Sequence, residues 1–243
     1  MTDKLPIFFQ QLTAFDTIHH SKLRFKADDN YIFASKTNVI PLVASELVQS
    51  LKHYPIVFIP DEKNESPTLV AVVGLADGIN QFVDSNGLWR PEIYIPAYVR
   101  GYPFLAVNKN EDQDSVLAFD PTASHFKNKD GIALVGKDAK PTDQLQTIMA
   151  FQNEYQLMLE HTRRMSKALN DAGLLEPGVI NVNPGDGTEP RQIKGFLIVS
   201  ENKLKALDDE SLQMLHELDA LGLAYAQLFS LMSLPNVTKF ISK

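Results

Sequence analysis

The chain has 243 residues, 44% of them hydrophobic, so it can bury a full core, which excludes disorder over most of its length. Its formal net charge of -7 comes from 30 acidic against 23 basic residues without a basic run, which argues against nucleic-acid binding. The absence of cysteine excludes disulfides, a thiolate nucleophile and cysteine-ligated metal sites.

The start of the chain resembles neither a secretory signal nor a membrane span. Residues 1–12 carry an acid near the front and a short apolar stretch interrupted by glutamine, unlike a signal peptide. No run approaches the roughly 18 apolar residues that a membrane span needs. We therefore expect a cytoplasmic protein by default, and surface association through a route without a classical signal peptide stays open.

The first predicted elements are a hairpin and a short helix. Residues 23–26 and 31–34 are strand-like and are separated by a turn-prone Asp-Asp-Asn sequence, which predicts a hairpin. Residues 41–53 begin with Pro41 and place aliphatic side chains four residues apart. This spacing predicts a short amphipathic helix that ends before Pro55.

Four apolar runs then predict strands. Residues 56–59 and 69–73 are rich in β-branched side chains, and their uniform apolarity indicates strands buried on both faces. Residues 104–107 and 116–119 repeat this signature on either side of the polar segment 108–114. We expect these last two to pair antiparallel.

The second half is mainly helical. A helical apolar stripe over residues 142–172 predicts one helix of about 30 residues, with Thr142 as N-cap and Gly173 as its stop. A loop at 181–190, which includes the turn-prone Asn-Pro-Gly-Asp-Gly sequence, precedes a predicted strand at 193–199.

After the acidic residues 208–210, a leucine-edged helix is expected, broken at Gly222 and reaching about Leu234. These leucine-rich segments fit either the core or a dimer surface. The predicted fold class is α+β: a β-rich N-terminal half with a mostly antiparallel sheet, a long amphipathic helix and a helical C-terminal segment. We expect one domain over 1–243, β-rich to about 138 and helical with one strand from about 139.

No motif predicts a catalytic or metal centre. The six histidines lack the spacing of a zinc site, and no P-loop, EF-hand or Gly-x-Ser-x-Gly sequence occurs. We therefore expect no cofactor and no metal, and catalytic residues stay unknown. Methionines on the long helix fit core packing better than an adaptable partner groove.

Residues 89–104, the aromatic block, concentrate side chains that can stack or donate hydrogen bonds. This block holds the only Trp, three Tyr, three Pro and two Arg. It fits a rigid crossing that covers the sheet, or a surface that binds an anionic or sugar-like ligand. The binding interpretation selects Trp89, Arg90, Tyr94, Tyr98, Arg100 and Tyr102.

The aromatic block is similar to the hallmark of the SapC family of bacterial proteins, with its Trp, Tyr-Ile-Pro-Ala-Tyr-Val-Arg and Tyr-Pro-Phe. Residues 31–34, 41–46 and 54–58 also resemble the family. Gly101 departs from a frequent second basic residue, which weakens inferences from a doubled positive charge. A looser similarity continues through Phe196, Glu201, Leu204, Leu207, Gly222, Leu223, Ser230 and Leu231.

This resemblance implies an association with bacterial surface layers and carbohydrate-related physiology, and it brings no established catalytic residues. It does not extend to the peptide-transporter permease of the same name, because this chain has no membrane-spanning run.

We expect a non-enzymatic binding or accessory protein that recognises a small ligand or a protein partner through the aromatic block. The alternatives are an enzyme that acts on a small metabolite with a carboxylate and histidine site assembled by the fold, and a self-assembling structural protein. Nucleic acid and a membrane span are not expected, and a homo-oligomer stays open.

Overall fold

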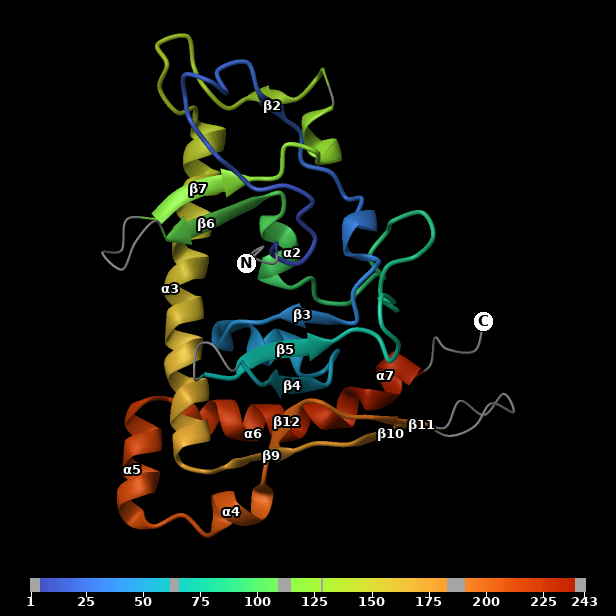
Figure 1. The fold of residues 1–243 in the computed structure, drawn as a ribbon, viewed down its shortest axis with the longest axis vertical. Helices are drawn as coiled ribbons and strands as arrows, with labels where there is room; N and C mark the ends of the chain where they lie inside the picture. Colours follow the sequence, from blue (N-terminus) through green and yellow to red (C-terminus); the bar gives the residue numbers. More distant parts are fainter. Residues whose placement is uncertain (1–4, 62–65, 109–114, 128, 183–190, 239–243) are drawn as a thin grey trace.

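Two antiparallel sheets lie along one long helix, α3 (Asp143–Asp171), which runs through most of the height of the molecule (Figure 1). The computed structural model describes residues 5–61, 66–108, 115–127, 129–182 and 191–238. Helix α3 contacts strands of both sheets and also the C-terminal helix α6 (Ala220–Ser230). The predicted α+β class is confirmed: antiparallel sheets dominate the N-terminal part, and the C-terminus is helical.

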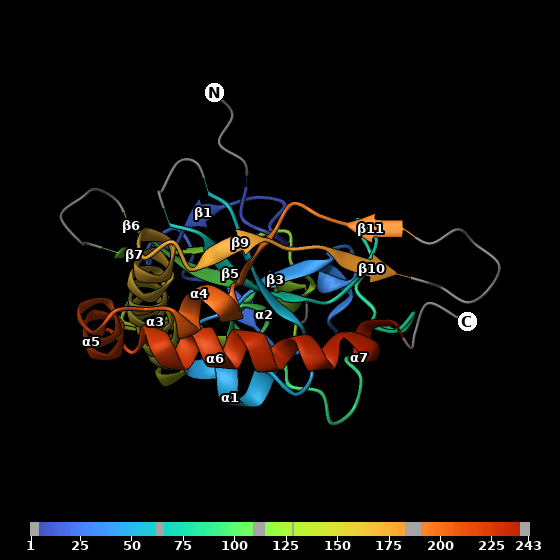
Figure 2. The ribbon, with the colours of Figure 1, turned by 90° about the horizontal axis from the view of Figure 1, so that it is seen from below.

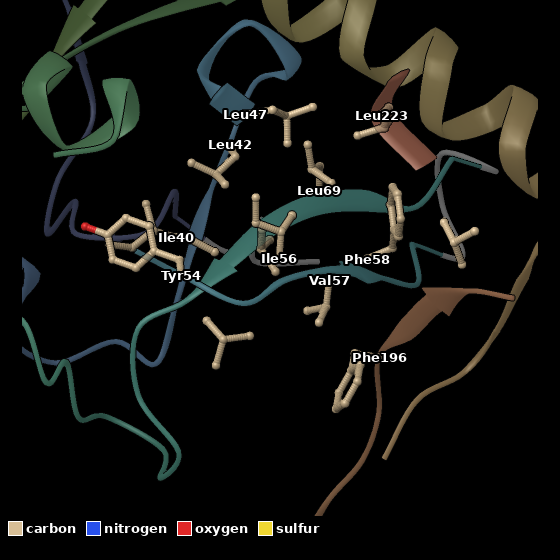
Figure 3. Packing of buried hydrophobic residues seen from close by; sticks show 14 of the residues in the cluster. Ile40, Leu42, Leu47, Tyr54, Ile56, Val57, Phe58, Leu69, Phe196 and Leu223 are labelled. Atoms are coloured by element: carbon tan, nitrogen blue, oxygen red, sulfur yellow. The ribbon is translucent and has the colours of Figure 1, made fainter. Parts of the chain in front are cut away.

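The larger sheet holds the main hydrophobic core. Its strand order is β3 (Val39–Pro41), β5 (Thr68–Val72), β4 (Ile56–Ile59), β12 (Leu197–Val199) and β9 (Leu175–Pro177). The apolar β4 and the apolar residues 69–72 of β5 are buried on both faces, as their composition predicts. Val57 points toward Phe196, whereas Leu69 lies on the side of Leu47 and Leu223 (Figure 3).

The smaller sheet has the order β1 (Thr13–Ala14), β7 (Ser115–Phe119) and β6 (Phe104–Asn108). Strands β6 and β7 pair antiparallel, with Phe104 opposite Phe119, which confirms the predicted pairing. The turn expected between them lies almost wholly outside the described residues. Two further ribbons pair β2 (Arg24–Phe25) with β8 (Ile132–Ala133), and β10 (Ile180–Val182) with β11 (Arg191–Ile193).

Helix α3 begins and ends close to where the sequence predicts. The Thr142 hydroxyl accepts a hydrogen bond from the Leu145 N–H at 3.5 Å, and Gly173 takes a left-handed φ of 68° just beyond the helix. The other α-helices are α1 (Leu47–Ser50), α2 (Ala97–Gly101), α4 (Glu201–Lys205), α5 (Asp209–Glu217) and α7 (Leu234–Thr238). Short 3-10 turns are η1 (Ile32–Ala34), η2 (Ala44–Glu46), η3 (Ser124–Phe126) and η4 (Leu231–Ser233).

The predicted hairpin of residues 23–26 with 31–34 is wrong. Strand β2 pairs instead with β8, and the Arg24 Nε donates to the Gly131 carbonyl at 2.7 Å. Residues 32–34 form η1, because the Asn30 side chain accepts from the Ile32 N–H and starts a turn.

The helix predicted over residues 41–53 is shorter than expected. Pro41 belongs to β3, where it pairs with Val70. Helical structure starts at Ala44, after Val43, whose N–H donates to the Glu46 carboxylate. This local hydrogen bond fixes the helix start, which residue spacing alone does not reveal.

Two C-terminal boundaries also differ from the predictions. The strand expected at 193–199 is divided into β11 and β12 at Gly195, whose φ of 92° interrupts the extended backbone. The break between α5 and α6 falls at Asp219, with φ 58°, and Gly222 lies inside α6. The Asn-Pro-Gly-Asp-Gly turn lies outside the described residues.

Candidate binding cavity

A cavity of about 390 Å³ opens where η2, the aromatic block and α3 meet. These segments are far apart in the sequence, but α3 contacts both η2 and α2. The cavity is lined by Val43, Ser45, Glu46, Tyr94, Ala97, Arg100, Phe151, Glu154, Tyr155 and Met158. Its wall therefore combines aromatic and aliphatic surface with two carboxylates and one guanidinium group.

Glu46 is the buried charge-bearing group of this wall, with only 4% of the residue exposed. Its Oε1 accepts from the Tyr94 hydroxyl at 2.8 Å and from the Ala97 N–H at 2.6 Å, while Oε2 accepts from the Val43 N–H at 3.1 Å. One carboxylate thus joins η2 to the aromatic block. Burial raises the pKa of Glu46, and these hydrogen bonds and the nearby Arg100 charge oppose that rise.

Tyr94 and Arg100 form the polar rim of the cavity. The Arg100 Nη2 donates to the Tyr94 hydroxyl at 3.2 Å, and its Nε donates to the Ile95 carbonyl at 3.1 Å. Burial, followed by the Glu46 charge, raises the pKa of Tyr94 to about 12, so its hydroxyl stays protonated and donates to Glu46. Within the described part of the chain, no hydrogen bond uses the Arg100 Nη1.

Helix α3 supplies the aromatic wall through positions one turn apart. The Arg100 guanidinium carbon lies 5.6 Å from the centre of the Phe151 ring, close enough for a cation–π contact. Tyr155 is 5% exposed, and burial raises the pKa of its hydroxyl. No hydrogen bond joins that hydroxyl to any residue that the structure describes, so it is available to a ligand in the cavity.

Trp89 and Arg90, also selected by the binding interpretation, lie away from this lining. Trp89 is buried and meets the Tyr31 ring edge-on, with the ring centres 5.7 Å apart. The Arg90 Nε donates to the Gln81 carbonyl at 2.7 Å. Both side chains hold the segment before the cavity against its neighbours.

Tyr98 and Tyr102 point to other neighbours as well. The Tyr98 hydroxyl donates to the Ile7 carbonyl at 3.0 Å, and the Tyr102 ring stacks on Phe33 with the ring centres 4.1 Å apart. Of the six selected residues, the structure therefore brings Tyr94 and Arg100 together at the cavity. The binding role of all six stays a prediction.

Sequence reasoning missed Glu46, Phe151 and Tyr155 as cavity residues. The available signal for Glu46 was its position three residues after Val43, the spacing at which a carboxylate can cap a helix start. The two α3 aromatics belong to the apolar stripe and carry no local sign of a site. The described residues contain no group of three or more His, Asp or Glu able to hold a metal.

Comparison with known proteins identifies a family. The family model described as SapC matches residues 15–237, which is nearly the whole chain. No curated protein and no solved structure matches. Across the part of the chain that the structure describes, no helix is both long and apolar enough to cross a membrane.

Proposed function

The chain belongs to the SapC family, and we propose that the protein is a non-enzymatic binding protein whose cavity receives a sugar or sugar acid. The observation that carries this proposal is the position of Arg100 beside an aromatic-lined cavity. Its guanidinium group is oriented by Tyr94 and Ile95, and Nη1 remains available to a ligand oxygen. A fixed guanidinium fork suits carboxylate and hydroxyl oxygens.

The other walls fit the same class of ligand. Phe151 and Met158 offer apolar surface to the C–H face of a sugar ring, and the Tyr155 hydroxyl can donate or accept. The Glu46 Oε2 accepts only one hydrogen bond from the described residues and can accept another from a ligand hydroxyl. This mixture of flat apolar and polar groups supports an accessory role in bacterial surface or carbohydrate-related physiology, as the family resemblance implies.

Calorimetric titration with glucose and glucuronate tests the proposal. We expect glucuronate to bind more tightly than glucose, because its carboxylate can pair with Arg100. Arg100→Ala should abolish this preference. Arg164→Ala is the matched control, since Arg164 is an exposed arginine on α3 that does not line the cavity. If the wild type and Arg100→Ala bound glucuronate with equal affinity, the cavity would be excluded as the binding site.

A second candidate function is an enzyme that uses Glu46 to move a proton. The favouring observation is a carboxyl group of raised pKa in the same cavity as Arg100. Glu46→Gln separates the two candidates: a binding protein still binds glucuronate through Arg100, with a loss limited to the Glu46 hydrogen bond, and shows no turnover. An enzyme turns over a nitrophenyl glucuronide, and Glu46→Gln eliminates that turnover while the folded protein persists.

A further inference from the structure

The C-terminal helical rod is free of charge over an unusual length. Residues 220–238 contain no Asp, Glu, Lys, Arg or His. They form α6, η4 and α7 in direct succession, and the rod crosses the near side of the molecule in a view from below (Figure 2). Surface helices normally carry polar or charged residues on the side that faces water, so an uncharged rod at the surface indicates a covered face.

The exposed side of this rod has a regular apolar pattern. Tyr225, Phe229 and Met232 are 48%, 59% and 82% exposed, and Gly222 is exposed with them. These four positions follow spacings of three, four and three residues. This is the heptad spacing of helices that pack side by side. We call these four residues the α6 seam.

The opposite side of the rod already contacts the core. Leu223 and Ala224 are buried, and the Gln227 side chain bonds the Val199 N–H at 2.9 Å and the Ile56 carbonyl at 3.0 Å. The rod is therefore fixed to the larger sheet through one face, so the α6 seam cannot rotate inward. Any partner must cover it from outside.

We propose that the α6 seam packs against the α6 seam of a second copy of this chain, with the two rods antiparallel. Tyr225 and Phe229 lie two positions on either side of Gln227, and Gly222 and Met232 lie five positions on either side. A two-fold axis at the level of Gln227 therefore places Tyr225 opposite Phe229 of the other copy, and Gly222 opposite Met232. Each large side chain then faces a complementary partner.

Space at Gly222 supports this pairing. No atom lies within 4 Å of a Cβ built at Gly222, so the position leaves room for the Met232 side chain of the second copy. The Tyr225 and Phe229 rings are already stacked, with their centres 6.4 Å apart and an interplanar angle of 28°. These rings lose little freedom on pairing, which favours association.

The exposed area is of the size that a weak, reversible dimer buries. From side-chain areas of about 150–250 Å², the exposed fractions of the three large seam residues amount to roughly 400 Å² for each copy. The two copies together then bury about 800 Å², in the range of transient interfaces below about 1,200 Å², so we expect dimers at high protein concentration.

A lipid surface is a poorer occupant of the α6 seam. Helices that lie on membranes carry Lys and Arg on their polar side, and residues 220–238 contain neither. The net charge of -7 also disfavours contact with anionic lipid. A neutral partner with the same seam, which the second copy supplies, fits better.

Sedimentation velocity over a broad concentration range tests the proposal. We expect the wild type to dimerise, and Phe229→Glu to raise the dimer dissociation constant by about thirtyfold or more. Leu157→Glu is the matched control, because Leu157 is an apolar residue of α3 that is 71% exposed and lies outside the α6 seam. Thermal melting verifies that both variants fold. A dimer that survives Phe229→Glu as it survives Leu157→Glu overturns the proposal.

The absence of natural cysteine permits a second measurement. Phe229→Cys should be captured as a dimer by a short bismaleimide linker, whereas Leu157→Cys should stay monomeric under the same conditions. A wild type that is monomeric up to millimolar concentration overturns the proposal. So does a monomer that sediments with phosphatidylcholine vesicles through the α6 seam, which would assign this surface to lipid.

Discussion

Replacing Glu46 with alanine should destabilise the protein more than replacing any exposed carboxylate. The change removes the acceptor of three hydrogen bonds, two of which connect η2 to the aromatic block. The N–H groups of Val43 and Ala97 are then left buried without this partner. The Tyr94 hydroxyl still accepts a hydrogen bond from Arg100, so the loss of its Glu46 partner costs less free energy.

The expected loss in the free energy of unfolding follows from the two buried N–H groups. Each unsatisfied buried donor costs about 1–3 kcal/mol, giving about 2–6 kcal/mol for the pair. Removing the buried carboxylate also relieves its own desolvation penalty, so we expect a net loss of about 3 kcal/mol. For a chain of this size, that corresponds to a Tm lower by about 6–12 °C. Glu46→Gln keeps an oxygen for Ala97 and should cost about 1–2 kcal/mol.

Urea unfolding measures this loss directly. Trp89 is the only tryptophan and is 7% exposed, so its fluorescence reports on the core beside the aromatic block. Glu154→Ala is the matched control, since Glu154 lines the same cavity but is exposed, and its free energy of unfolding should change by less than about 0.5 kcal/mol. A Glu46→Ala variant as stable as Glu154→Ala would refute the structural role of these hydrogen bonds.

Three further outcomes are expected. Arg100→Ala should lower the glucuronate affinity in calorimetry to that for glucose, with a Tm change under about 2 °C because Arg100 is exposed; loss of folding would instead make this residue structural. Burial raises the pKa of Glu46. The stability that the protonated Glu46 carboxyl contributes is therefore full below its usual pKa of 4.5, and it is lost as pH rises through the pKa of the folded state. The stability of the wild type relative to Glu46→Gln should therefore fall above pH 4.5 in paired urea titrations, and a constant difference would contradict this. Burial acts to raise the pKa of Asp120, but hydrogen bonds from Thr122 and Gln10 outweigh it and lower that pKa. Asp120→Ala should cost about 2–4 kcal/mol at pH 7, with the wild-type advantage fading as pH falls below 3.8, and a pH-independent cost would exclude the ionised carboxylate as its source.

The elements predicted correctly are those whose signal is local. Strands β4 and β5 are continuous apolar runs, and α3 has both a long helical stripe and an N-cap at Thr142. In these segments propensity, pattern and capping all favour the same structure. The hairpin expected near residue 28 failed because β2 finds its partner more than one hundred residues later, at β8. No periodicity in the N-terminal segment carries that information.

The candidate site was predictable only in the part that lies within one segment. Tyr94 and Arg100 are close in sequence and stand out by residue type. The Glu46 carboxylate accepts from the Ala97 N–H across a sequence separation of 51 residues. Phe151 contacts Arg100 across the same sequence separation. Such contacts depend on how α3 packs against η2 and α2, which residue spacing does not specify.

The short helix α2 helps to divide the aromatic block into two sides. Ala97 and Arg100 are three residues apart in α2 and line the cavity together with Tyr94, which lies before the helix. Tyr98 and Tyr102 contact the interior instead. Prolines before and after α2 conceal this short helix in the sequence, so the block reads as one continuous surface. Its two faces have different chemistry: one holds rings against the core, and the other presents an oriented guanidinium group. If the second face binds a ligand as proposed, the rigidity of the first lowers the entropic cost of that binding.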